Sequence, residues 1–456
     1  MKISIIGTGY VGLVSGVCLA EKGHHVVCVD LDPAKVDQIN AGRSPIHEKG
    51  LDELLRKHCG GNFRATTDLH AAVLDSEISM IAVGTPFDGD EIDLRFIRAA
   101  ARQIGAALKD KPGYHVVLVK STVVPGTTSE VVLPLVEETS GKRAGRDFGI
   151  GMNPEFLREG EAVQDFLYPD RIVLGGLDER TLDVLEELYL PFPNVDQIRA
   201  NPRTAEMIKY TANSLLATMI SFSNEIGNLC ASIPDVDVTE VMRGVHLDKR
   251  LSPILPDGNR ITPAFTTYLE AGCGFGGSCF PKDVKALVAH GRKLGRNMRL
   301  LDAVVEVNIA QPGAMMTLLA GHFDLLEGVR VTVLGLAFKP GTDDIRESPA
   351  IPIIMELLAR KAQVTAFDPV ARKEAEKHFG DGALDYADTL HEALENAQAV
   401  LLLTRWPQFD RLPEMLAKHS KQPVLIDGRR VVNKNSVERY EGIGLGPGDR
   451  KFVVAS

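Results

Sequence analysis

The sequence predicts an α/β protein with two Rossmann-like parallel-sheet domains, joined by a long central helix and a helical region. Three observations carry this prediction. Short β-branched segments alternate with helix-sized segments through the first two hundred residues. A proline-free segment with an apolar stripe at helical spacing follows at 204–230, and a second alternating region begins after Pro312. Strands separated by helix-sized crossovers are typical of parallel sheets with right-handed connections.

The N-terminal segment matches a dinucleotide-binding fingerprint. A strand at 2–6 leads into the glycine-rich turn at 7–12, an apolar helix that ends near Lys22, and a strand at 26–29 that stops at Asp30. Glycines allow the tight turn and the close approach of a pyrophosphate to the helix N-terminus. Asp30 would accept hydrogen bonds from ribose hydroxyls and repel a 2′-phosphate, which predicts NAD rather than NADP. A signal peptide is the alternative for this apolar stretch, but the regular glycines and the charged Glu21 argue against it.

Further strands are expected at 78–83, 116–119 and 172–175. Thr85, Thr122 and the loop 153–159 follow such strands or their neighbours, and they fall at the carboxyl edge where ligands bind in parallel sheets. Each polar residue has a plainer interpretation as a helix cap, which is the favoured one for Thr122 taken alone.

The central segment predicts one long helix over 204–230. Lys209 and Asn213 are four residues apart and therefore share a face of this helix. The segment is rich in apolar and small residues, which indicates burial. A lysine and an asparagine on a buried helix need partners, so a functional role is favoured.

The segment 274–283, Gly-Phe-Gly-Gly-Ser-Cys-Phe-Pro-Lys-Asp, places Cys279 in a glycine-rich turn. Glycines let the backbone bend and let a ligand approach. A nearby ammonium such as that of Lys282 would favour the nucleophilic thiolate. The segment therefore predicts covalent catalysis by Cys279; a tight turn with a structural cysteine is the alternative.

The region after Pro312 predicts a second Rossmann-like unit, with strands near 329–334, 364–368, 399–404 and 424–426 and a helix at 348–361. Its glycines do not complete a dinucleotide fingerprint, which favours a nucleotide other than NAD. Lys339, Arg346 and Arg429 lie at its strand ends or turns, where cations can meet phosphate. The expected domains are 1–200 for NAD, 201–312 for dimerisation and catalysis, and 313–456 for the nucleotide sugar.

Composition is that of a globular enzyme. The chain has 456 residues, 25% charged residues and a net charge of −10, which disfavours a nucleic-acid partner. Apolar runs such as 399–403 are too short to span a bilayer, so no membrane partner and a cytoplasmic location are expected. The six cysteines lack disulfide or zinc spacing, which predicts reduced thiols and no structural metal.

Eight ordered motifs make the chain similar to the UDP-glucose/GDP-mannose dehydrogenase family over essentially its whole length. They are GTGYVG at 7–12, VGTP at 83–86, KSTVVPGT at 120–127, NPEFLREG at 153–160, AEMIKYTAN at 205–213, GFGGSCFPKD at 274–283, AFKPGTDDIRES at 337–348 and DGRR at 427–430. The residues 404–406 and 427–430 look like the UDP-glucose branch, whereas 44–46 and 153–160 look almost as much like the GDP-mannose branch.

The resemblance implies an NAD-dependent four-electron oxidation of UDP-glucose to UDP-glucuronate, with GDP-mannose and UDP-N-acetylmannosamine as the competing substrates. Hydride leaves C6 of the sugar, and Cys279 adds to the resulting aldehyde as a thiohemiacetal. A second oxidation gives a thioester that water hydrolyses. Lys209 and Asn213 would stabilise the oxyanion, while Glu155 and Thr122 would position the water. Lys209, Asp283 and Glu155 all remain open as the base at each step.

The same resemblance implies two further sets of contacts and a homodimer formed through the central helix. NAD would contact Gly7, Gly9, Tyr10, Val11, Gly12, Asp30, Lys35, Thr85, Thr122, Glu159, Lys282 and Arg346. The nucleotide sugar would contact Glu155, Phe156, Leu157, Arg158, Lys209, Asn213, Arg250, Tyr268, Leu269, Phe275, Gly276, Lys339 and Arg429. The segment between Arg250 and Tyr268 is longer than the family pattern predicts for many UDP-glucose enzymes.

Two other function classes compete with this hypothesis. A two-electron hydroxyacid dehydrogenase would use the Rossmann domain and the helical lysine but would not need Cys279. A non-catalytic NAD-binding regulator would not need to keep Cys279, Lys209, Asn213 and Asp283 together, and all four are present.

Overall fold

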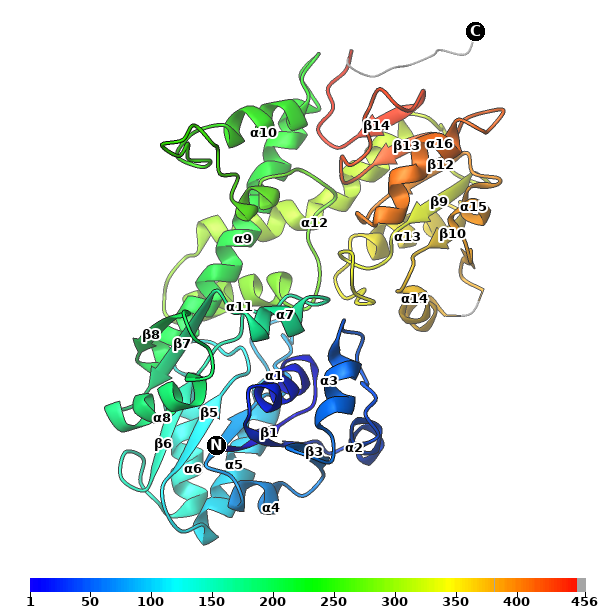
Figure 1. Ribbon diagram of the computed structural model, residues 1–456. Coiled ribbons are helices and arrows are strands. Elements are labelled where there is room, and N and C mark those ends of the chain that lie inside the picture. The colour runs from blue at the N-terminus through cyan, green and yellow to red at the C-terminus, as the bar shows by residue number, and fades with distance from the viewer. Residues whose placement is uncertain (381, 449–456) are drawn as a thin grey trace. The chain divides into compact units, whose positions relative to one another are not determined.

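The computed structural model describes residues 1–380 and 382–448 (Figure 1). The chain forms two compact units, Met1–Ala212 and Asn213–Ser456. Helix α9 (Pro202–Cys230) starts in the first unit and continues in the second. The domain boundary expected at residue 312 falls inside helix α12 (Arg299–Ala320), and residues 381 and 449–456 of the expected third domain lie outside the described residues.

The first unit is built on an eight-stranded sheet whose order is β3-β2-β1-β4-β5-β6-β7-β8. The strand order reverses between β1 and β4, which is the place where doubly wound sheets bind ligands. The strands are β1 (Lys2–Ile6), β2 (His25–Val29), β3 (Phe63–Thr66), β4 (Ile78–Ile81), β5 (His115–Val119), β6 (Phe148–Met152), β7 (Arg171–Gly176) and β8 (Asp196–Ala200).

One strand pair departs from the parallel arrangement expected for 172–175. β7 pairs with β6 in the antiparallel sense, and β8 then runs parallel to β7. The only helix between β6 and β7 is α7 (Ala162–Leu167), whose six residues are too short to return along the sheet. The chain therefore stays at the carboxyl edge and enters β7 from there.

Helices cover both faces of this sheet. α1 (Tyr10–Glu21), α2 (Pro33–Asn40), α3 (Leu51–His58), α7 and α8 (Glu179–Tyr189) contribute to one apolar cluster. α4 (Leu69–Leu74), α5 (Arg95–Asp110), the π-helix η1 (Thr128–Val132) and α6 (Leu133–Ser140) contribute to the other. The strands between them read as continuous buried runs, as expected for a sheet covered on both sides.

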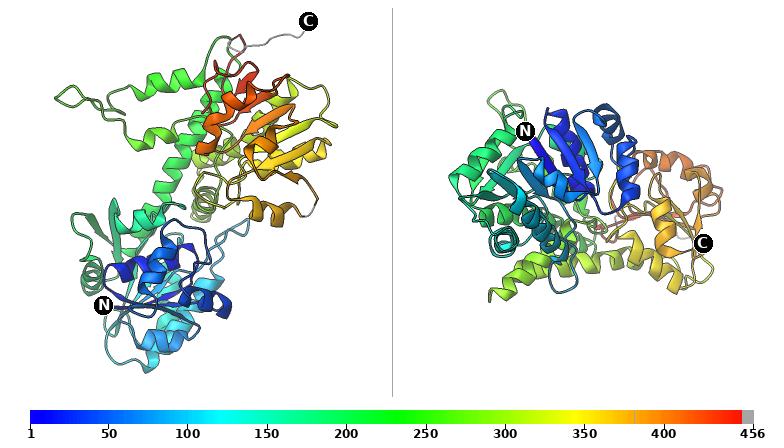
Figure 2. Two further views of the ribbon diagram at one scale, coloured as in Figure 1. Left: turned by 45° about the vertical axis from the view of Figure 1, so that its right-hand side comes forward. Right: turned by 90° about the horizontal axis from the view of Figure 1, so that it is seen from below.

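The second unit contains a six-stranded parallel sheet of order β11-β10-β9-β12-β13-β14, coloured yellow to red in Figure 2. Its strands are β9 (Arg330–Leu334), β10 (Gln363–Phe367), β11 (Asp385–Tyr386), β12 (Ala399–Leu402), β13 (Val424–Asp427) and β14 (Tyr440–Gly442). Its helices are α13 (Ala350–Ala359), α14 (Arg372–Phe379), α15 (Leu390–Leu394), η3 (Pro407–Arg411) and α16 (Leu412–Leu416). With both sheets in place, the predicted fold class is confirmed.

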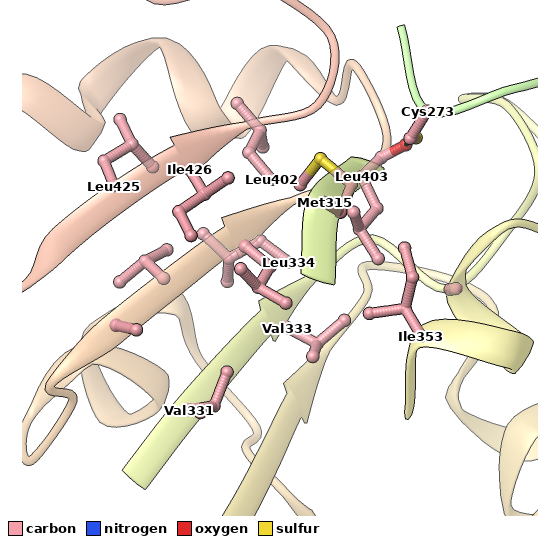
Figure 3. Packing of buried hydrophobic residues seen from close by; sticks show 14 of the residues in the cluster. Cys273, Met315, Val331, Val333, Leu334, Ile353, Leu402, Leu403, Leu425 and Ile426 are labelled. Carbon is pink, nitrogen blue, oxygen red and sulfur yellow. Dashed lines mark hydrogen bonds between the residues drawn. The ribbon is translucent and has the colours of Figure 1, made fainter. Parts of the chain in front are cut away.

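Between α9 and this sheet the chain forms four helices: α10 (Val238–His246), η2 (Ala264–Tyr268), α11 (Phe280–Lys293) and α12. Helix α12 lies against the second sheet, where Met315 packs beside Leu402 and Leu403 (Figure 3). Cys273, from the glycine-rich segment, reaches the same cluster.

Helix α12 is, within the described part of the chain, the one helix long and apolar enough to cross a membrane by length and composition. The sequence-based expectation that the apolar runs are too short to span a bilayer considered runs such as 399–403 and did not consider this helix. Core helices pass the same test, and α12 carries Gln311, which is fully buried and hydrogen-bonded within the second unit.

Candidate active site

The turn after β1 has the geometry that a dinucleotide needs. Gly7 has φ +103°, and a Cβ there would lie 2.6 Å from the carbonyl oxygen of Ala82. A Cβ on Gly12 would lie 2.0 Å from the oxygen of Gly7, so neither position accepts a side chain. Gly9 caps helix α1 without a side-chain hydrogen bond, and a Cβ on it would meet open space. The exposed N-terminus of α1 is therefore open to a diphosphate.

Asp30 directly follows β2, beside this turn. Its carboxylate accepts hydrogen bonds from the backbone nitrogen and the hydroxyl of Thr8 and from the nitrogen of Asp32. Burial raises the pKa of Asp30, but these hydrogen bonds outweigh burial and leave the pKa below its ordinary value. The carboxylate is thus ionised and held at the end of the strand, where a ribose would lie. The residues present fit NAD.

Tyr10 joins this turn to the loop after β6. Its hydroxyl donates to Glu48 and accepts from the backbone nitrogen of Gly160 at 2.9 Å. Glu48 also accepts from the nitrogens of Gly160 and Ala162 at 2.7 and 2.9 Å. Glu48 was not among the predicted site residues, because an isolated glutamate in a loop carries no sequence signal.

A buried ion pair lies between the loop after β6 and helix α9. The Nζ atom of Lys209 is 2.9 Å from Oε1 of Glu155, and the two side chains are 4% and 5% exposed. Burial raises the pKa of Glu155, but the charge and hydrogen bond of Lys209 outweigh burial and lower the pKa. Two predicted catalytic residues are thereby brought together in one buried, charged site.

A second lysine lies close to this pair. Lys120 follows β5, is buried, and donates to Oδ1 of Asn153 at 2.7 Å. Burial lowers the pKa of Lys120 to about 7; the charge of Lys209 lowers it further and that of Glu155 opposes the shift. The sequence prediction noted the motif of Lys120 but assigned the residue no role.

Thr122 and Thr85 lie at the carboxyl ends of neighbouring strands β5 and β4. The hydroxyl of Thr85 donates to the backbone oxygen of Thr122 at 2.8 Å, which ties the two loops together. The loop that continues from Thr122 is held by Glu206 of α9, a fully buried residue that accepts from the nitrogens of Gly126 and Thr128. Thr122 and Lys209 are therefore anchored to the same helix.

In the second unit, Asn213 of α9 donates to Oδ2 of Asp283 at 2.6 Å. The other carboxylate oxygen of Asp283 accepts from Lys282 at 2.6 Å. Asp283 is 1% exposed and lies in the first turn of α11. Cys279 is the N-cap of the same helix, where the helix dipole favours negative charge. Four predicted residues are thus collected at one end of α11.

The glycines before Cys279 are required by close packing against the segment after β9. A Cβ on Gly276 would lie 2.3 Å from the backbone oxygen of Glu347, and one on Gly277 would lie 2.7 Å from the ring of Phe338. The nitrogen of Gly277 donates to the oxygen of Arg346 at 2.8 Å. Two of the sequence motifs therefore form one packed unit.

Amide side chains of α9 and α12 fix the same loop. Asn308 accepts from the nitrogen of Phe275 at 2.8 Å and donates to its oxygen at 3.0 Å. Gln311 donates to the oxygen of Gly272 at 2.8 Å, and Asn224 accepts from the nitrogen of Gly272 at 2.7 Å. Sequence reasoning missed these residues; buried amides within apolar helices are the signal that could have found them.

Aromatic rings and Arg429 complete this site. The ring of Phe280 is 6.2 Å from that of Tyr268 and 6.1 Å from that of Phe275. Arg429, which follows β13, donates to the oxygens of Leu403 and Gly274 at 2.6 and 3.0 Å. Leu269 and Gly276 are buried, and together with Tyr268 and Phe275 they place four of the predicted substrate residues on the loop from 268 to 279.

The remaining predicted residues have more exposed positions. Arg250 is 86% exposed and paired with Asp248, and Arg158 is 58% exposed and paired with Asp165 and Glu161. Arg346 is exposed and paired with Asp344. Lys35 lies exposed on α2, while Val11, Phe156, Leu157, Glu159 and Lys339 are partly buried.

The second sheet differs from the first at the position equivalent to Asp30. Asp368 follows β10 and accepts from the nitrogens of Leu336 and Ala337 and from the indole of Trp406. Its carboxylate is 6% exposed and fully engaged by the protein. A ribose could not displace these partners without leaving buried donors unpaired, which agrees with a nucleotide other than NAD on this sheet.

Known proteins match the chain along its length. Three family models match: the NAD binding domain of the UDP-glucose/GDP-mannose dehydrogenase family at 1–193, its central domain at 203–310 and its UDP binding domain at 332–434. UDP-glucose 6-dehydrogenase AglM of Haloferax volcanii is 45% identical over 97% of this chain and 100% of its own. GDP-mannose 6-dehydrogenase of Pseudomonas aeruginosa is 43% identical over 81% of each.

A solved structure matches as well. The UDP-glucose dehydrogenase from the hyperthermophilic archaeon Pyrobaculum islandicum has a TM-score of 0.88 and 40% identity, with 97% of each chain covered. The fold, the dinucleotide turn and these matches lead to one conclusion. The chain belongs to the UDP-glucose/GDP-mannose dehydrogenase family and is an NAD-dependent nucleotide-sugar 6-dehydrogenase.

Proposed function

We propose that the protein is a UDP-glucose 6-dehydrogenase that oxidises UDP-glucose to UDP-glucuronate through a thioester on Cys279. The single observation that carries this proposal is the placement of Cys279 at the N-terminus of α11, four residues before the buried Asp283. A two-electron dehydrogenase has no use for a thiol that is held this way.

The thiol makes a four-electron oxidation possible in two steps. Bound NAD would accept the hydride in each oxidation. The sulfur of Cys279 adds to the C6 aldehyde, and the aldehyde oxygen takes up a proton. Loss of hydride and a proton from this thiohemiacetal gives a thioester, and attack by water breaks the carbon–sulfur bond and releases the carboxylate and the free thiol.

The polar groups that the family resemblance implies have distinct tasks in this scheme. Asn213 and Lys209 would stabilise the oxygen that gains negative charge, because each is a buried donor. Glu155, which is ionised by its pair with Lys209, would hold the attacking water together with Thr122. One group must also take up the proton of the sugar hydroxyl, directly or through a water. Asp283, Lys209 and Glu155 are the three candidates for this base.

Most of the proposed NAD contacts lie in the first unit, and two of them, Lys282 and Arg346, lie in the second. The proposed NAD contacts are Gly7, Gly9, Tyr10, Val11, Gly12, Asp30, Lys35, Thr85, Thr122, Glu159, Lys282 and Arg346. The proposed sugar-nucleotide contacts in the second unit include Tyr268, Leu269, Phe275, Gly276, Lys339 and Arg429. The UDP-glucose 6-dehydrogenases among the relatives support uridine as the base.

GDP-mannose is the second candidate substrate, because a GDP-mannose 6-dehydrogenase is 43% identical over 81% of this chain. UDP-N-acetylmannosamine is a third. The same Cys279 chemistry applies to all three, so the choice depends on contacts with the base and with C2 of the sugar.

A cytoplasmic homodimer formed through α9 is also proposed. Leu215, Phe222 and Leu229 are seven residues apart on this helix and are 59%, 49% and 58% exposed. Large apolar side chains in such a row are typical of a surface that a partner helix covers.

The proposal is tested by measuring NADH formed per sugar consumed with UDP-glucose, GDP-mannose and UDP-N-acetylmannosamine in parallel, for the wild type and Cys279→Ser. Two NADH per UDP-glucose, with uronate formation lost in the variant, is the expected result. The same yield from GDP-mannose alone would keep the mechanism and reject the substrate. One NADH per sugar would reject the mechanism.

A further inference from the structure

Lys120 is a buried lysine for which the reaction described above has no role. It follows β5, is 4% exposed, and donates to Oδ1 of Asn153 at 2.7 Å. Across residues 1–380 and 382–448, its ammonium has no carboxylate within 4.0 Å. A buried ammonium whose acceptor is a neutral amide is held only weakly in its charged form.

Asn153 connects Lys120 to the loop that carries Glu155. Its Oδ1 atom also accepts from the hydroxyl of Tyr189, and its Nδ2 donates to the oxygen of Val173 at 2.8 Å. Asn153 is therefore fixed from three sides, and Glu155 follows it after a single proline. A change at Lys120 reaches Glu155 through this short, rigid connection.

The partners of Glu155 are already in place without Lys120. Oε1 of Glu155 pairs with Lys209 at 2.9 Å, and Oε2 accepts from the nitrogen of Leu157 at 2.6 Å. A charged Lys120 would therefore be a second buried ammonium beside this pair. Burial and the charge of Lys209 lower the pKa of Lys120 to about 7, although Glu155 opposes the shift, so the side chain titrates near neutral pH.

We propose that Lys120 is a positioning residue for the Glu155–Lys209 pair, which holds the Glu155 loop through Asn153 and changes the charge beside the pair when it gains or loses a proton. This inference rests on the proposed function of that pair. Above neutral pH, Lys120 is a neutral amine and Lys209 is the ammonium that faces Glu155. Below neutral pH, the added charge favours ionised Glu155 and disfavours charged Lys209.

The groups that face Lys120 come from three elements: Glu155 from the loop after β6, Lys209 from α9, and Tyr189, through Asn153, from the end of α8. Burial raises the pKa of Tyr189, and Glu155 stays ionised, so neither of them titrates near pH 7. We assign the inflection expected near pH 7 to Lys120, and the Lys120 variants test this assignment.

The first test is the pH dependence of kcat for the wild type, Lys120→Gln and Lys120→Met, with Lys111→Met as the control. Gln keeps a donor for Asn153 and cannot titrate. Lys111 is a second buried lysine of the same unit, and it donates to the backbone oxygens of Val73 and Leu74 at 3.0 and 2.7 Å. We expect an inflection near pH 7 in the wild type and in Lys111→Met that both Lys120 variants lose. Its persistence in either Lys120 variant, or its loss in the control, would overturn the proposal.

The second test needs no turnover. Unfolded lysine has its ordinary pKa of 10.5, so between about pH 7 and 10.5 the unfolded chain binds a proton that the folded chain does not. The Tm of the wild type relative to Lys120→Met should therefore rise as pH increases through this window. A constant difference would overturn the proposal. If the wild type forms no NADH from any of the three nucleotide sugars, the proposed function fails. The pH dependence of Tm would still decide whether Lys120 loses its proton near pH 7 in the folded protein.

Discussion

At the residue scale, one ion pair of the first unit is almost completely buried. Lys209 and Glu155 are ionised and almost completely buried, and each makes the charge of the other tolerable. A buried ion pair adds little to the stability of the fold when compared with two apolar residues in the same place. Removing one partner, however, destabilises the fold, because the other charge stays buried without compensation.

Lys209→Met should therefore lower the free energy of unfolding by about 3–5 kcal/mol at pH 8. Without Lys209, burial raises the pKa of Glu155 above the unfolded value, so the ionised carboxylate destabilises the fold most at high pH. The penalty should shrink as pH falls toward 5 and Glu155 takes up a proton. Urea unfolding at the two pH values measures this.

The control for this variant is Lys2→Met, which removes an ion pair with Asp75 whose side chains are 55% and 57% exposed. Its cost should stay below about 1 kcal/mol at both pH values. Equal penalties for the two variants would mean that the buried pair behaves like a surface pair.

At the scale of the elements, the glycine-rich loop and the segment after β9 act as one packed unit. Gly276→Ala places a methyl group 2.3 Å from the backbone oxygen of Glu347, so the loop must move. A displacement of about 1 Å near the reacting atoms reduces kcat by about 100-fold. Steady-state kinetics of this variant measure the effect.

Gly244→Ala is the matched control. Gly244 lies exposed in helix α10, and a Cβ there meets no atom within 4 Å. This substitution should raise the free energy of unfolding by about 0.5–1 kcal/mol and leave kcat unchanged. Wild-type kcat in Gly276→Ala would show that the loop tolerates the movement.

The elements also show what sequence reasoning can reach. The helix expected at 204–230 is present as Pro202–Cys230, because its apolar stripe and its lack of internal proline are local signals. The direction of β7 was not predictable, since it depends on where the short segment with α7 runs in space. β14 was missed because Tyr440–Gly442 is too short to show an alternating pattern.

The site residues also divide into those that local sequence motifs indicate and those that depend on tertiary contacts. Motifs led to Cys279, Lys209, Asn213 and Asp283, and the structure places Asn213 against Asp283 and Lys209 against Glu155. Lys120 and Glu206 lie inside quoted motifs and Asn308 lies in an apolar helix, but their roles depend on tertiary contacts that the sequence does not show. Arg250 lies in none of the eight motifs and was named only through the resemblance; its side chain is exposed and paired with Asp248.

At the scale of the whole molecule, the exposed row on α9 predicts assembly. Phe222→Glu places a charge in the centre of this row and should convert a dimer to monomers. Leu300→Glu is the control, because Leu300 is 67% exposed on α12, away from this row in the sequence. Sedimentation velocity measures the oligomeric state of both variants. A wild type that sediments as a monomer would contradict the proposed dimer.

The central claim is that the carbon at C6 becomes covalently attached to Cys279. Its most direct test is acid quenching during turnover with UDP-glucose and NAD, followed by mass spectrometry of the peptide that contains Cys279. The predicted result is an acyl adduct on Cys279 in the wild type, with more adduct in Glu155→Gln because hydrolysis is slowed, and none in Cys279→Ser. Uronate formation by Cys279→Ser, or turnover of the wild type without any adduct in either protein, would contradict the claim.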